Sequence, residues 1–107
     1  MTDDDGARRV DIVHRPGDPP SEALRVRVGD EIAVTLHGSP AYGWTPVEVT
    51  EGPLAVVEAH ATEGTVHATF RATAAGVAGL RSTSSFRGDR FGPRTRLWRL
   101  QVHVDQS

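Results

Sequence analysis

The sequence predicts an all-β domain, a sandwich of about seven to eight short strands. Apolar and polar residues alternate in many short runs, as they do in strands with one buried face. Glycine- and proline-rich breaks separate these runs, and no segment combines helical spacing with a cap and a stop. The 107 residues suffice for one hydrophobic core, so we expect a single domain over residues 8–107 and a flexible tail over residues 1–7.

The N-terminal half contains the clearest alternation. A short strand is predicted at residues 8–14, where Val10 and Ile12 alternate with polar residues. The segment RPGDPPSE (15–22) is expected to be a loop, because it holds three prolines and a glycine. The run LRVRVGDEIAVTLH (24–37) alternates on both sides of a Gly-Asp step and predicts two strands.

The C-terminal half continues the pattern. The run VEVTEGPLAVVEAH (47–60) predicts two short strands broken at Glu-Gly-Pro, and residues 64–86 predict two longer strands that turn at an Ala-Gly step. The segment RGDRFGPR (87–94) is a second loop, rich in glycine and arginine. The closing strand, TRLWRLQVHVD (95–105), places four apolar residues on one face: Trp98, Leu100, Val102 and Val104.

The loop HGSPAYGWTP (37–46) contains the only tyrosine and one of the two tryptophans. Pro40 fixes φ near −65° and Gly43 can adopt a positive φ, so the loop is expected to be stiff before it meets a partner. Tyr42 at its tip would offer a large contact area, and Trp44 would point inward and anchor the base. The alternative interpretation is that both rings only cover the end of the sandwich.

Composition excludes several classes of protein. The chain is 37% apolar and 24% charged, which fits neither a disordered chain nor a membrane protein, and no apolar run approaches the roughly 20 residues that span a bilayer. The start, MTDDDGARR, lacks the apolar region of a secretory signal, so a cytoplasmic location is expected unless a leader has been removed.

No catalytic or metal-binding motif is recognisable. The absence of cysteine excludes disulfides, thiolate nucleophiles, Cys-type zinc sites and blue-copper ligation. The serines and threonine at 82–85 lack a nucleophile elbow and are interpreted as polar strand positions. We therefore expect no enzyme activity, no cofactor and no metal. The histidines lack the spacings typical of metal sites: His14, His37, His60, His67 and His103.

Charge is unevenly distributed along the chain. Residues 1–63 carry twelve acidic side chains and five arginines, whereas residues 64–107 carry two acidic side chains and seven arginines. Arginines interleaved with Phe91 and Trp98 leave nucleic-acid binding open as a minor alternative, which the overall pI of about 6.2 disfavours. The RGD tripeptide at 87–89 is attributed to chance in a chain rich in arginine and glycine.

From Leu24 to Val104 the order of these pieces resembles the chagasin-like inhibitors of papain-type cysteine peptidases. LRVRVGDEIAVTL resembles that family's first strand pair, and RLWRLQVHV resembles its last strand. SPAYGW lies where the family has Asn-Pro-Thr-Thr-Gly-aromatic, and FRATAAGVAGLRSTSSFRG resembles the stretch that leads to the family's arginine-bearing loop.

The resemblance implies an immunoglobulin-like sandwich whose three loops at one end enter the peptidase cleft. Pro40 and Gly43 match the first motif, while Ser39 replaces its asparagine and Pro46 replaces its second aromatic residue. The second loop is expected near HATEGTV, and Arg87 is the counterpart of the third loop's arginine. The predicted contact residues are Ser39, Pro40, Ala41, Tyr42, Gly43, Trp44, Glu63, Gly64, Phe86, Arg87, Gly88, Asp89, Arg90 and Phe91.

The leading hypothesis is therefore a monomeric protein that blocks a papain-type cysteine peptidase without doing chemistry of its own. The second hypothesis is a non-inhibitory β-sandwich module that binds another protein, its loops having diverged. An arginine-driven nucleic-acid binder is the third. A cupredoxin-like electron carrier is excluded, because its usual copper site needs a cysteine.

Overall fold

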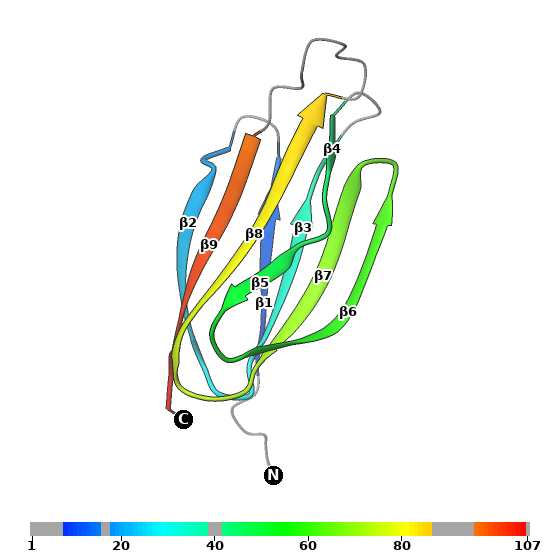
Figure 1. Cartoon of the computed structure of the whole chain (residues 1–107). Coiled ribbons are helices and arrows are strands. Elements are labelled where there is room, and N and C mark those ends of the chain that lie inside the picture. The colour runs from blue at the N-terminus through cyan, green and yellow to red at the C-terminus, as the bar shows by residue number, and fades with distance from the viewer. Residues whose placement is uncertain (1–7, 16–17, 39–41, 87–95, 107) are drawn as a thin grey trace.

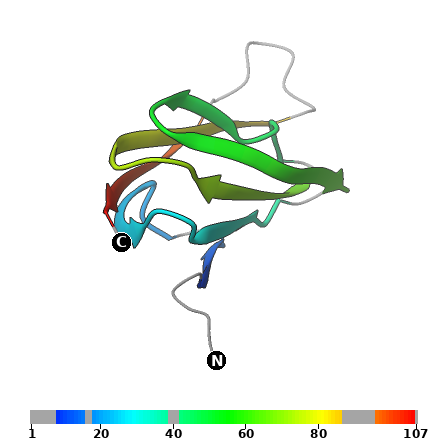
Figure 2. The same ribbon diagram turned by 90° about the horizontal axis from the view of Figure 1, so that it is seen from below.

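The computed structural model describes residues 8–15, 18–38, 42–86 and 96–106. Over these residues two β-sheets pack face to face (Figure 1 and Figure 2), which confirms the predicted all-β, immunoglobulin-like sandwich. The predicted tail over residues 1–7 lies outside this part of the chain. The described strands are β1 (Arg9–His14), β2 (Ser21–Arg27), β3 (Glu31–Leu36), β4 (Tyr42–Trp44), β5 (Glu48–Glu51), β6 (Leu54–Thr62), β7 (Thr65–Ala72), β8 (Gly76–Phe86) and β9 (Arg96–Asp105).

The two sheets differ in size and order. The four-stranded sheet has the order β1-β3-β7-β6, and the five-stranded sheet has the order β2-β9-β8-β4, with β5 also paired to β8. The pairs β1–β3 and β2–β9 are parallel, and the other neighbours are antiparallel. Strands β2 and β3 follow each other in the sequence but lie in opposite sheets, so the turn between them carries the chain across the sandwich.

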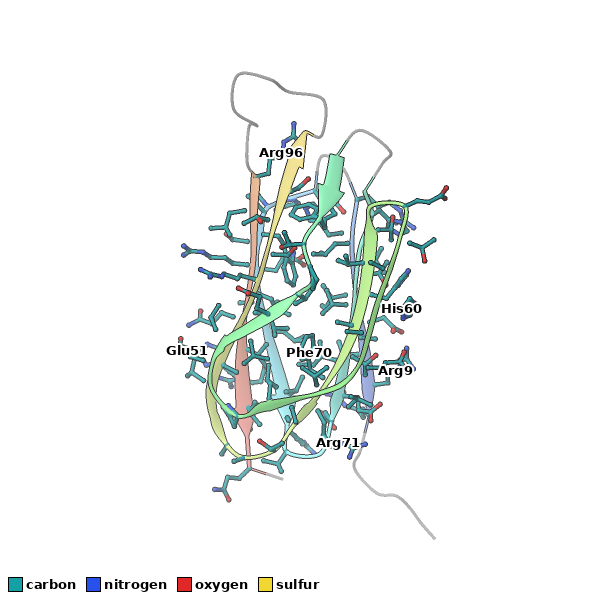
Figure 3. The ribbon with its side chains drawn as sticks, turned by 45° about the vertical axis from the view of Figure 1, so that its right-hand side comes forward. Arg9, Glu51, His60, Phe70, Arg71 and Arg96 are labelled. Atoms are coloured by element: carbon teal, nitrogen blue, oxygen red, sulfur yellow. The ribbon has the colours of Figure 1, made fainter. Side chains whose placement is uncertain are left out.

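The predicted alternation fills the space between the sheets. Trp98 on β9 and Phe70 on β7 come from opposite sheets and are both fully buried, and Figure 3 shows Phe70 between the two layers. Burying an apolar side chain of this kind contributes about 1.5–3 kcal/mol, so these residues hold the sheets together. The face predicted for the closing strand is confirmed: Trp98, Leu100, Val102 and Val104 are all buried.

Two segments predicted as loops are partly strands, which raises the number of strands from seven or eight to nine over the described residues. Residues 42–44, in the predicted aromatic loop, form β4 because their backbone pairs with β8. Strand β2 begins at Ser21, inside the proline-rich segment 15–22. Pro19 and Pro20 come just before this strand and so remove no donor from it, and the Pro20 carbonyl accepts a hydrogen bond from the Arg99 N–H at 2.9 Å. No helix long and apolar enough to cross a membrane occurs among the described residues.

Asp30 ties together the strands at the β2–β3 turn. Its carboxylate is fully buried and accepts the backbone N–H groups of Arg8 and Arg27, each at 2.9 Å. The Arg8 guanidinium approaches it at 3.7 Å. Burial alone would raise the pKa of this carboxyl, but the backbone donors and the charges of Arg8 and Arg27 outweigh burial, and the net pKa lies below its ordinary value of 3.8.

Replacing Asp30 by asparagine should destabilise the fold by about 1.5–3 kcal/mol at neutral pH, because a charged acceptor of two backbone donors is lost. The folded-state pKa is lowered, so this stabilisation is fully present above pH 3.8 and is lost as the pH falls through the folded-state pKa. Urea unfolding measured from pH 7 to pH 2 should show a constant difference in the free energy of unfolding between D30N and the parent at higher pH. This difference should shrink only below pH 3.8. The control D105N removes an exposed carboxylate, 3.5 Å from Arg25, and should change stability by less than about 0.5 kcal/mol. A difference in the free energy of unfolding that is the same at every pH would contradict the role given to Asp30.

Candidate functional site

The strand ends next to all three predicted loops lie at the same end of the sandwich, the upper end in Figure 1. Tyr42 on β4 is opposite Phe86 on β8, which brings together the flanks of the first and third loops. The backbone N–H of Trp44 donates to the carbonyl of Gly64 at 3.1 Å, which brings the first loop to the β6–β7 turn. We call this region the loop end and define it by residues 38, 42–44, 62–65 and 84–86.

Trp44 anchors the base of the first loop, as predicted. Its half-buried ring packs against the edge of the core. The indole Nε1–H donates to the His37 carbonyl at 3.1 Å. The ring also meets the His14 imidazole edge to face, with 5.5 Å between the centroids. The side chain therefore fixes the direction in which the chain enters and leaves the first loop.

The second loop is a two-residue turn between Thr62 and Thr65, which are paired across β6 and β7. Glu63 has φ of 51° and Gly64 has φ of 84°, so both central residues have the positive φ that a type I′ hairpin turn requires. Glycine adopts this conformation freely, whereas glutamate does so only with strain. The turn is fixed to the first loop a second time, because the Gly38 N–H donates to Thr65 Oγ1 at 3.0 Å.

A hydroxyl cluster holds the exit of β4 against β8. The Thr45 N–H donates to the Thr83 carbonyl at 2.8 Å, and the Thr83 N–H donates back to Thr45 Oγ1 at 3.1 Å. The buried hydroxyl of Ser82 donates to the Thr45 carbonyl at 2.6 Å. Ser82 is therefore a structural polar residue of the strand, as the sequence indicated, and its hydroxyl bonds the backbone.

The predicted site residues fall into three groups. Gly43, Trp44, Glu63 and Gly64 lie at the loop end, and Glu63 is exposed there. The backbones of Tyr42 and Phe86 are paired in the β4–β8 ladder, so Tyr42 begins a strand and is not part of an unpaired tip. The remaining predicted residues lie outside the described part of the chain: Ser39, Pro40, Ala41, Arg87, Gly88, Asp89, Arg90 and Phe91.

Sequence reasoning missed the residues that support these loops from behind. These residues are His14, Thr45 and Thr65, which contact residues of distant strands. Their only sequence signal was a polar residue at the edge of an apolar run.

A separate open groove lies on the outer face of the five-stranded sheet. It is lined by Thr50, Arg81 and Arg99 among others and contains none of the predicted contact residues. Within the described ranges, no three His, Cys, Asp or Glu side chains gather to hold a metal ion.

Comparisons with known proteins identify the fold. No family model and no curated protein matches the sequence. The cysteine protease inhibitor EhICP2 from Entamoeba histolytica matches with a TM-score of 0.65 and 12% identity over 92% of this chain and 97% of that one. Amebosin matches with a TM-score of 0.48 and 16% identity over 82% of this chain and 100% of that one. An inclusion body protein from Burkholderia cenocepacia matches with a TM-score of 0.49 and 16% identity over 76% of this chain and 59% of that one. The chain therefore has the fold of the EhICP2 inhibitor, as the resemblance in sequence implied.

Replacing Glu63 by asparagine should stabilise the protein by up to about 1 kcal/mol, because asparagine tolerates a positive φ better than glutamate does. The control E63Q also removes the charge but keeps the unbranched side chain, and it should stay within about 0.5 kcal/mol of the parent. Urea unfolding of the three proteins measures both effects. Equal stabilisation by the two variants would assign the effect to charge and contradict backbone strain at Glu63.

Replacing Thr65 by valine should cost about 1 kcal/mol and expose the Gly38 amide to faster hydrogen exchange, because the only change is loss of the hydroxyl that accepts this N–H. The matched control is T62V on the opposite strand, since the exposed Thr62 hydroxyl makes no hydrogen bond to any described residue. Amide exchange by NMR reports Gly38 directly. Unchanged exchange at Gly38 in T65V would show that the second link between the two loops does not hold them.

Proposed function

We propose that the protein inhibits papain-type cysteine peptidases by placing its loop end in the active-site cleft. The observation that carries this proposal is the hydrogen bond from the Trp44 N–H to the Gly64 carbonyl, which joins loop flanks from the two sheets. The likeness in fold to a cysteine protease inhibitor supports it. The proposal requires no chemistry from the inhibitor, because a body that fills the cleft excludes the substrate.

Rigidity would give such an inhibitor its affinity. A loop that is ordered before binding loses less conformational entropy on docking, so a small contact area can bind tightly. Here the flanks of the first loop are bonded at Gly38, at Trp44 and through Thr45, and the second loop has only two central residues. The chain contains no cysteine, so this rigidity does not depend on a disulfide.

Residues of the loop end would make the contacts. The backbone of Tyr42 begins β4 at this end, and tyrosine is a common contact residue because it combines a large surface with few rotatable bonds. Glu63 presents a carboxylate at the hairpin turn, where the backbone is strained, and strained residues are often found at binding sites. A negative charge at this point would favour a peptidase whose cleft rim carries a basic side chain.

Titration against several papain-type peptidases with a fluorogenic substrate should show inhibition at micromolar concentrations or below. Tyr42→Ala should weaken binding by at least about 2 kcal/mol, roughly 30-fold in the inhibition constant, as loss of a hot-spot tyrosine does. Val77→Ala, at the opposite end of β8, removes a side chain that is 45% exposed and should leave the constant unchanged. The proposal fails if none of the peptidases is inhibited, or if both variants lose affinity equally while remaining folded.

A further inference from the structure

Two histidines lie side by side on the outer face of the four-stranded sheet. His60 on β6 is directly opposite His67 on β7 in the antiparallel register. Their rings are stacked, with 4.8 Å between the centroids and 25° between the planes. Figure 3 shows His60 on the outer side of the sheet, away from the buried Phe70. The two imidazoles are thus neighbours on a surface that solvent reaches.

A third strand orients one of these rings. Thr35 on β3 is opposite His67 on its other side, and Thr35 Oγ1 shares a hydrogen bond with His67 Nδ1 at 3.0 Å. This bond leaves Nε2 of His67 as the nitrogen that is available to a ligand. Histidines that bind metals commonly donate their other ring N–H to an oxygen in this way, which fixes the ring and its tautomer. With a metal on Nε2, the Nδ1–H of His67 would donate to Thr35 Oγ1.

The second ring can move to meet the first. His60 is exposed, and the β-carbons of directly opposite residues in an antiparallel pair lie only about 4.5–5.5 Å apart. Turning the His60 side chain about its own bonds therefore suffices to direct a nitrogen toward His67 Nε2, with no change in the backbone. Such a bidentate pair would hold a metal at the usual distance of about 2.0–2.1 Å from each nitrogen.

The charges around the pair favour a cation. Glu58 is opposite Thr69 on the same outer face, two residues before His60, and Glu63 follows in the turn. On β7, the nearest described arginine of this face is Arg71, which follows His67 by four residues. Its guanidinium forms an ion pair with Glu31 at 2.8 Å. The local balance is therefore negative, and imidazole is a ligand suited to zinc, copper and nickel.

We propose that His60 and His67 form a two-imidazole site for a divalent transition-metal ion of the zinc, nickel or copper class, with Thr35 as the positioning residue. Water would complete the coordination, since no third His, Cys, Asp or Glu converges there among the described residues. The bound ion would link β6 to β7 close to the Glu63–Gly64 turn and stabilise the folded protein by mass action. This inference is independent of the proposed inhibitory function.

Calorimetric titration of the untagged chain with zinc chloride at pH 7.5 should give one saturable site and raise the melting temperature. Two-dimensional NMR of the imidazole nitrogens should show zinc-dependent shifts at His60 and His67. H60A and H67A should each abolish the site, and T35V should weaken it about 10- to 100-fold, as loss of a ring-orienting partner does. His60 is exposed, so H60A tests the site without disturbing the core.

The matched control is H103A, which removes a half-buried histidine from β9 in the other sheet and should leave zinc binding unchanged. The proposal is overturned if the parent protein does not bind zinc. It is also overturned if the H60A/H67A double variant binds zinc as the parent does, or if H103A weakens binding as much as H60A does. Nickel chloride used as a second probe should give the same ranking of variants.

Discussion

One backbone hydrogen bond between the two sheets determines the geometry of the loop end. The Trp44 N–H belongs to the five-stranded sheet and the Gly64 carbonyl belongs to the turn of the four-stranded sheet, and they meet at 3.1 Å. The bond forms because the indole ring is held from behind by the His37 carbonyl and the His14 ring. A second bond, from the Gly38 N–H to Thr65 Oγ1, ties the other flank of the first loop to the same turn.

This constraint explains how a small chain without disulfides can present a stiff surface. The core between Trp98 and Phe70 holds the layers together along their length, and the Asp30 carboxylate fixes the opposite end of the sandwich. The loop end then needs only local bonds to become rigid. The strained φ of Glu63 fits this description, because such a conformation persists only where the surrounding structure imposes it.

The sequence predicted the layers of this fold better than its connections. Period-two alternation identified the buried faces of β3, β7 and β9, because it records which side chains avoid water. Alternation did not reveal β4, because this strand has only three residues, one of them a glycine, and is too short to show a pattern. These residues form a strand because their backbone pairs with β8. The parallel pairing of β2 with β9 and the contact between His60 and His67 also depend on register, which residue spacing alone does not specify. The position of the loop end was inferred from a family resemblance, whereas the bonds that build it came from the structure.

The proposed inhibition requires that one preformed end of the sandwich, built from both sheets, is the surface that contacts the peptidase. The most direct test is to map backbone amide shifts of the labelled protein by NMR while adding a papain-type peptidase with a blocked active-site thiol. The perturbed amides should lie at the end of β8, in β4 and in the Glu63–Gly64 turn together. Perturbations confined to one sheet, or centred on the outer groove around Arg81 and Arg99, would contradict it.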